Sequence, residues 1–142
     1  TKQSVYGLNA MDEWIKGMNE VRGFCPCRGC QAGLGDASTR RWNAAYPNAM
    51  VTQAASKVAA SYLRRIAPDF PIAARPHIES AAGSYDRIVA LLTPAVGNGP
   101  DSYQAFIGDL ARQKVHVTKV LVPVKAEYAA IADDLERALK AE

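Results

Sequence analysis

Apolar residues in the last part of the chain recur at spacings of four and three, the repeat of one face of an α-helix. They are Val124, Tyr128, Ile131, Leu135 and Ala138. Lys, Glu, Asp and Arg occupy most of the positions on the other face. The pattern therefore predicts an amphipathic C-terminal helix over about residues 125–140, with its apolar face buried.

The N-terminal half contains two more helical stripes. The first consists of Leu8, Met11, Trp14, Ile15, Met18 and Val21. It predicts a helix that ends near Gly23, because glycine commonly follows the last turn of a helix. The second consists of Val51, Ala54, Ala55, Val58, Tyr62 and Ile66. It predicts a helix from about Pro47 to Ala67 that buries these side chains.

Residues 23–48 separate these two helices. The segment is rich in glycine and polar residues and contains all three cysteines of the chain. A connection of about 25 residues without secondary structure is longer than most loops in compact domains. We therefore expect a Cys- and Gly-rich loop at about 23–48 that is functional, held in place by its cysteines, or mobile.

Residues 77–122 fit both helix and strand patterns. Residues 77–95 offer a helical face, yet residues 86–93 also suit a buried strand. Residues 115–122 are rich in β-branched side chains, which favour strands. Pro123 would cost an interior helical position about 3 kcal/mol, but it suits the first turn of a new helix. The turn sequence Gly-Asn-Gly-Pro at 97–100 lies between two apolar runs, which favours strand pairing.

We therefore predict an α+β fold, in which two N-terminal amphipathic helices and a C-terminal helix accompany a small sheet within about residues 77–122. The alternative is an all-α bundle with a long C-terminal helix. In that case the closing helix extends backwards at the same spacing, and only Lys114 departs from the apolar pattern. The residues that extend it are Tyr103, Ile107, Leu110, Lys114, Val117 and Leu121.

The composition is that of an ordinary globular protein. The chain has 142 residues, of which 49% are hydrophobic and 22% are charged, so it can bury a core without metal or disulfide support. We expect a single domain over residues 1–142. No apolar run reaches the roughly 18 residues of a membrane span, and the chain does not open on a basic-then-apolar signal segment. The sequence thus predicts synthesis in the cytoplasm and no membrane contact.

Charge is distributed unevenly along the chain. The net charge is only +3, but residues 14–75 contain nine basic and three acidic residues. The candidate basic contact surface consists of Lys16, Arg22, Arg28, Arg40, Arg41, Lys57, Arg64, Arg65 and Arg75. Such a surface suits an acidic protein neighbour, a second copy of the chain, or non-specific contact with a DNA backbone. No combined aromatic and basic motif accompanies it, so the sequence does not predict recognition of specific bases.

Cys25, Cys27 and Cys30 form the densest group of reactive side chains. Thiolates at such close spacing can bind zinc or an iron–sulfur cluster, and Arg28 would favour their charged form. A tetrahedral site needs a fourth ligand, which His77, His116 or a second subunit could supply. Reduced thiols, disulfides within the loop or between subunits, and a redox switch are the alternatives. Each histidine alone is more typical of a structural hydrogen-bonding residue than of a ligand.

No group of residues forms a catalytic signature. Glu79 and Asp86 are seven residues apart and lack a third group for acid–base chemistry. The Gly97-x-Gly99 pair lacks the further residues of a dinucleotide or phosphate loop. The sequence therefore predicts that the protein is not an enzyme and that it requires no cofactor, with zinc or an iron–sulfur cluster as the alternative.

Four short motifs resemble those of the small neck, or tail-completion, proteins of long-tailed bacteriophages. They are residues 6–9 (Tyr-Gly-Leu-Asn), 65–68 (Arg-Ile-Ala-Pro), 103–107 (Tyr-Gln-Ala-Phe-Ile) and 120–124 (Val-Leu-Val-Pro-Val). In that family a strand region follows the Ala-Pro end of the second helix. The chain departs from the family pattern at residues 108–110, where Gly-Asp-Leu replaces Glu-Phe-Gly, and in its cysteine-bearing segment. The resemblance implies a ring-forming, non-enzymatic subunit of the virion between the head connector and the tail tube.

Three hypotheses for function follow. The first is a structural assembly subunit of a phage or phage-like particle, which forms a homo-oligomer and contacts neighbouring assembly proteins. The second is a small helical protein that binds zinc or an iron–sulfur cluster through its three cysteines. The third is a regulator that uses the same thiols as a redox switch.

Overall fold

The computed structural model describes residues 8–19, 37–106 and 109–142, with the backbone alone described for residues 37–44. Its helices are α1 (Leu8–Asn19), α3 (Ala37–Ile66), the 3₁₀ turn η1 (Ala67–Asp69), α4 (Arg75–Val96), α5 (Tyr103–Phe106), α6 (Leu110–His116), the π-helical turn η2 (Val117–Leu121) and α7 (Val122–Lys140). These residues contain no β-strand. The predicted α+β fold with a sheet within 77–122 is therefore wrong, and the all-α alternative describes the chain.

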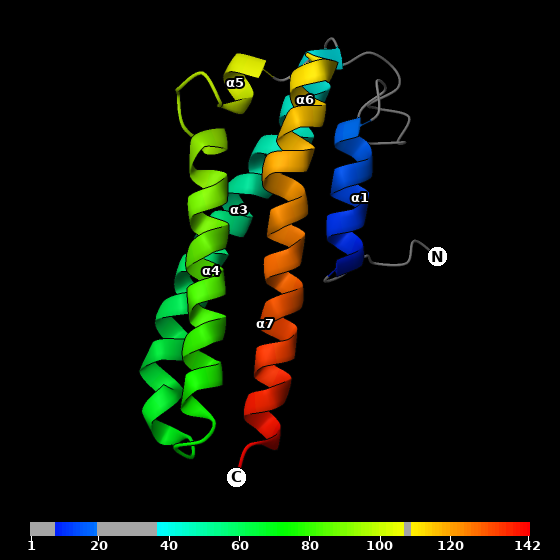
Figure 1. The fold of residues 1–142 in the computed structure, drawn as a ribbon. Helices are drawn as coiled ribbons and strands as arrows, with labels where there is room; N and C mark the ends of the chain where they lie inside the picture. The colour runs from blue at the N-terminus through cyan, green and yellow to red at the C-terminus, as the bar shows by residue number, and fades with distance from the viewer. Residues whose placement is uncertain (1–7, 20–36, 107–108) are drawn as a thin grey trace, which may run out of the picture.

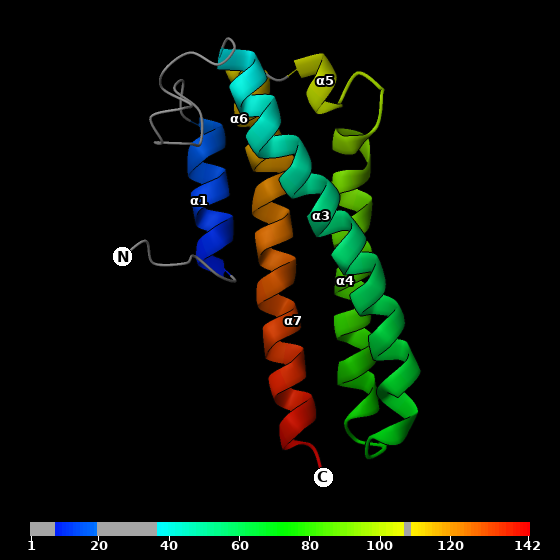
Figure 2. The same ribbon diagram turned by 180° about the vertical axis from the view of Figure 1, so that it is seen from behind.

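The helices form an elongated bundle in which α4 is the central packing partner (Figure 1). α3 packs against one side of α4 and α7 packs against the other. α1 packs against α6, η2 and the first turns of α7. Seen from behind, α3 crosses the bundle from the end where α6 lies to the far end of α4 (Figure 2). None of the described helices is both long enough and apolar enough to span a membrane.

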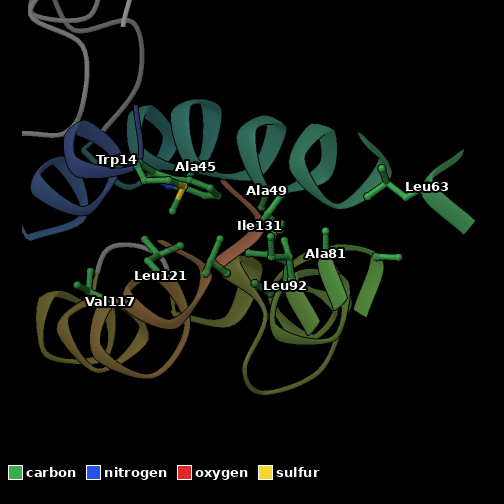
Figure 3. Close-up of a cluster of buried hydrophobic side chains, with 14 of the residues drawn as sticks. Trp14, Ala45, Ala49, Leu63, Ala81, Leu92, Val117, Leu121 and Ile131 are labelled. Atoms are coloured by element: carbon green, nitrogen blue, oxygen red, sulfur yellow. The ribbon is translucent and has the colours of Figure 1, made fainter. Parts of the chain in front are cut away.

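On α4 the core consists of small and branched side chains that recur along the buried face of the helix. Ala81, Ala82, Ile88 and Leu92 are each 0% exposed. Alanine permits a close approach between helices, and the branched side chains fill the space that remains. Figure 3 shows Ala81 and Leu92 beside Ile131 of α7, with side chains of α3 opposite them. The helical pattern of residues 77–95, rather than the strand pattern, therefore determines this segment.

The predicted strand at 115–122 is helical. α6, η2 and α7 follow one another without a break from Leu110 to Lys140. Within that segment Val117 and Leu121 are buried, as is Val124 just after it, each at most 5% exposed, whereas Val115 and Val122 are 52% and 49% exposed. The spacing of four and three places the three buried residues together on one face, so burial outweighs their intrinsic strand preference.

Pro123 is accommodated just after a wide turn of this helix. The N–H of Val122 donates to the carbonyl of Val117, five residues earlier, which is the π-helical pattern. A proline has no N–H to donate and crowds the preceding turn of a regular helix. The regular hydrogen bonds between residues four apart are already interrupted at η2. Pro123, which has no N–H to donate, therefore follows directly after the turn in which the hydrogen-bond spacing of the helix changes.

The second N-terminal helix is longer than the sequence predicts, and it presents a different face to the core. α3 begins at Ala37, within the predicted loop, and Pro47 lies inside it rather than at its start. Of the residues predicted to be buried, only Ile66 packs against the core. The others are exposed to solvent: Val51 is 68% exposed, Val58 70% and Tyr62 50%, and Ala54 and Ala55 are exposed as well. The buried stripe consists of Ala45, Ala49, Ser56, Ala60 and Leu63. Both stripes have a helical period, and the one with smaller side chains packs in the bundle.

The dependence of the bundle on α4 generates a stability prediction. Ile88 is 0% exposed, so we expect Ile88→Ala to lower the free energy of unfolding by about 2–5 kcal/mol. The matched control is Ile72→Ala in the connection before α4, where the side chain is 79% exposed and the expected change is within about 0.5 kcal/mol. Urea unfolding followed by circular dichroism measures both. Equal losses for the two variants would contradict the packing described.

Candidate interaction surface

The outer face of α3 is exposed and apolar. It consists of Val51, Ala54, Ala55, Val58 and Tyr62, all of them exposed. Each residue of an α-helix advances by about 100°, so Val58 lies roughly opposite the buried Ser56. The outer face therefore points away from the bundle. Met50, beside it, is 46% exposed.

Basic residues border this face without any acidic neighbour on the same helix. Residues 37–66 contain five basic and no acidic residues. Arg64 pairs across to α4, where its guanidinium lies 2.5 Å from the carboxylate of Asp86 and 3.8 Å from that of Glu79. The hydrogen bond to Asp86 raises the pKa of Arg64 above its usual value. Lys57 and Arg65 have no ion-pair partner among the described residues.

These two cations lie at the rim of a shallow depression on the outer face. The guanidinium of Arg65 lies 5.5 Å from the centre of the Tyr62 ring, within the range of a cation–π contact. The depression is lined by Lys57, Val58, Ser61, Tyr62 and Arg65. It therefore combines an apolar floor with a positively charged edge, an arrangement that suits an apolar side chain with acidic neighbours.

A groove continues this surface between α1, α3 and α7. Val51 belongs to both the outer face and the groove, whose volume is about 470 Å³. The other lining residues are Ala10, Met11, Trp14, Pro47, Asn48, Thr52 and Tyr128. The indole Nε1 of Trp14 is buried and has no hydrogen-bond partner among the described residues. The apolar surface thus extends beyond α3 toward α1.

The other residues of the predicted basic surface are dispersed over the fold. Lys16 is exposed on α1. Arg75, at the start of α4, donates to the carbonyls of Pro68 and Phe70 at 3.0 Å each, so it closes the connection between α3 and α4. Arg40 and Arg41 lie on the first turns of α3, but their side chains are outside the described part, as are Arg22 and Arg28 altogether. In the described part, the predicted surface reduces to the α3 residues.

The predicted metal site lies outside the described residues. Cys25, Cys27 and Cys30 all belong to that part of the chain, and binding of zinc or an iron–sulfur cluster by them stays a prediction. Within the described ranges, no group of three or more His, Cys, Asp and Glu side chains could hold a metal ion. Of the candidate fourth ligands, His77 is half-buried near the start of α4, and His116 is buried at the end of α6.

His116 is part of a buried aromatic cluster. The hydroxyl of Tyr103 and Nε2 of His116 lie 2.8 Å apart and form a hydrogen bond. The ring of Phe106 lies 5.1 Å from the imidazole, centre to centre. Burial lowers the pKa of His116 to about 4 and raises the pKa of Tyr103 above its usual value. His116 is therefore neutral at pH 7, and it has the structural role that the sequence suggested for it.

A recess of about 300 Å³ lies beside this cluster. His116, Phe106, Arg112 and Lys119 are among its lining residues. The guanidinium of Arg112 donates to the backbone carbonyls of Pro100 and Ala105, so it holds the connection before α6. His116 and Arg112 are therefore engaged in structural contacts, and we assign the candidate surface to α3.

The sequence contained a signal for this surface that periodicity alone did not reveal. Two stripes of helical period run along residues 45–66, and only one of them can face α4. The complete absence of acidic residues from 37–66 and the smaller side chains of the Ala45 and Ala49 stripe would have favoured the arrangement observed. Small residues pack closely between helices, and a strongly basic helix tends to keep one side exposed.

The burial of His116 predicts a dependence of stability on pH. The ordinary pKa of histidine is 6.5 and that of His116 in the folded protein is about 4, so the unfolded chain binds the proton first as pH falls. The contribution of His116 is fully present above pH 6.5 and is lost toward pH 4, by about 2 kcal/mol at pH 5. His116→Gln removes this titration. In urea unfolding at pH 7 and pH 5, wild type should lose about 2 kcal/mol more than the variant; parallel losses would contradict the assignment.

Comparison of the chain with models of protein families, with curated protein sequences and with solved structures finds no match. Its function is therefore inferred from its own surface and chemistry.

Proposed function

We propose that this chain is a non-enzymatic structural subunit that assembles with further copies of itself through the outer face of α3. The observation that carries the proposal is the exposure of Val51, Val58 and Tyr62 on one side of a long helix. Contiguous apolar surface that a monomer leaves in water is typical of a protein-interaction site.

The physical driving force is burial of this apolar face. Removal of apolar surface from water stabilises a contact by about 25 cal/mol per Å². The spacing of the exposed residues is that of an amphipathic helix that packs against another helix. Lys57 and Arg65 stand beside the apolar residues, as polar residues do at the rim of an interface, where they favour an acidic neighbour over a basic one.

The resemblance to phage neck proteins gives the most specific form of this proposal. In that form the subunit forms a ring in the virion, contacts neighbouring assembly proteins, and places basic residues near the DNA backbone. The strand region of that family has no counterpart in the described part of residues 77–122, which is helical. The proposal of self-assembly therefore depends on the outer face of α3, and the neck location depends on the short motifs alone.

A matched pair of valine variants tests the proposal. Val58 lies on the outer face at 70% exposure, and Val115 lies on α6 at 52% exposure. We expect wild type and Val115→Asp to form the same discrete oligomer. Val58→Asp should raise the dissociation constant at least tenfold, because it places a charge in the centre of the contact.

Native mass spectrometry and light scattering over a range of protein concentrations measure the mass of each variant. Reductant is present throughout, so that cross-links through cysteine do not contribute to the mass. A wild type that stays monomeric at high concentration would disprove self-assembly. Equal association of the two valine variants would show that the outer face of α3 is not the contact.

A further inference from the structure

The last turns of α7 have a second exposed face that none of the described helices covers. α1 is about 18 Å long and the helix from Leu110 to Lys140 is about 46 Å long, at 1.5 Å per residue. Figures 1 and 2 show α1 beside the upper part of this helix, while no described helix lies beside the lower part on the side away from α4. Among the described elements, the C-terminal half of α7 therefore has packing on one side only.

This face presents two exposed apolar residues. Leu139 is 81% exposed and Ala132 is also exposed. They are seven residues apart, about two helical turns, so they lie along one side of the helix. We call these two residues the free face of α7. Leu139 is the most exposed of the large apolar side chains in the described residues.

Acidic residues surround the free face. Residues 129–142 contain four carboxylates and two cations. Arg137 lies 4.0 Å from Asp134, and Lys140 lies 2.5 Å from Glu136, so both cations have partners on their own helix. Asp133 and Glu142 are exposed and have no ion-pair partner among the described residues.

The free face of α7 and the outer face of α3 are complementary. Each combines exposed apolar residues with two charges that have no ion-pair partner among the described residues. The charges are positive on α3 (Lys57 and Arg65) and negative at the C-terminal end, with Asp133 on α7 and Glu142 two residues beyond it. The two faces therefore have charges of opposite sign.

The two faces lie on different parts of one chain. Val58 and Tyr62 are on the side of α3 opposite its buried stripe, which packs in the bundle against α4. We infer that the outer face of α3 in one copy packs against the free face of α7 in another copy, with Leu139 in the depression between Lys57 and Arg65. The inference rests on the proposed self-assembly and names the surface that α3 meets. Such a contact can close as a reciprocal pair or as a ring.

Two charge-reversed variants test the pairing. The α3 variant carries Lys57→Glu and Arg65→Glu, and the α7 variant carries Asp133→Lys and Glu142→Lys. All four residues are exposed, so both variants should retain the helical circular dichroism spectrum of wild type. Each variant alone then has like charges on both faces, and its dissociation constant should rise at least tenfold. An equal mixture should regain wild-type association within about threefold, because opposite charges again meet at both contacts.

Controls separate the contact from a general charge effect. Lys114→Glu with Lys119→Glu reverses two exposed charges on α6 and η2, so this variant should associate like wild type. Raising the salt concentration from about 50 mM to 500 mM should weaken the restored association, because salt screens exposed charges. Leu139→Asp should weaken self-association as much as Val58→Asp.

The outcomes separate this inference from the proposed function. Restoration in the mixture, together with loss of association in Leu139→Asp, supports the pairing of α3 with α7. A wild-type oligomer that Val58→Asp disrupts, but that the mixed charge variants do not restore, overturns the pairing and leaves self-assembly through α3 intact. A monomeric wild type overturns both.

Discussion

The burial of α4 between α3 and α7 is the constraint on which the rest of the bundle depends. Its two buried sides contain Ala81, Ala82, Ile88 and Leu92, all 0% exposed, so both neighbouring helices must approach closely. α3 satisfies this requirement with its alanine and serine stripe. The larger apolar side chains of α3 lie on the opposite side of the helix, where they are exposed to solvent. The exposed face that we assign to assembly is thus a consequence of close packing on the opposite side of the same helix.

Polar contacts tie the remaining elements to this layer. Buried Gln113 donates from Nε2 to the carbonyl of Met18 at 3.2 Å. This carbonyl lies near the end of α1, where backbone carbonyls have no donor within the helix. Arg87 of α4 donates to the carboxylate of Glu127 on α7 at 2.8 Å, and this hydrogen bond lowers the pKa of Glu127. A buried polar group without a partner costs about 1–3 kcal/mol. These contacts therefore favour this pairing of helices and also add to its stability.

Charges of opposite sign lie on α3 and on the C-terminal half of α7. The charged residues of α3 are all basic. Arg64 forms ion pairs with Asp86 and Glu79 of α4. Lys57 and Arg65 remain at the surface beside the outer face. The C-terminal half of α7 has the opposite excess. One chain thus carries both members of a complementary pair on separate faces, the condition for assembly from identical subunits.

The sequence by itself determined the helices whose apolar residues form a single stripe. The stripes of α1 and α7 predicted both elements, because a lone apolar face leaves one way to bury it. Tertiary structure decided the rest. Val117 and Val124 favour strands locally, but their helical spacing became decisive once both were buried in the bundle. Residues 45–66 contain two stripes of the same period, and only the close approach of α4 selects the one with small side chains for the core.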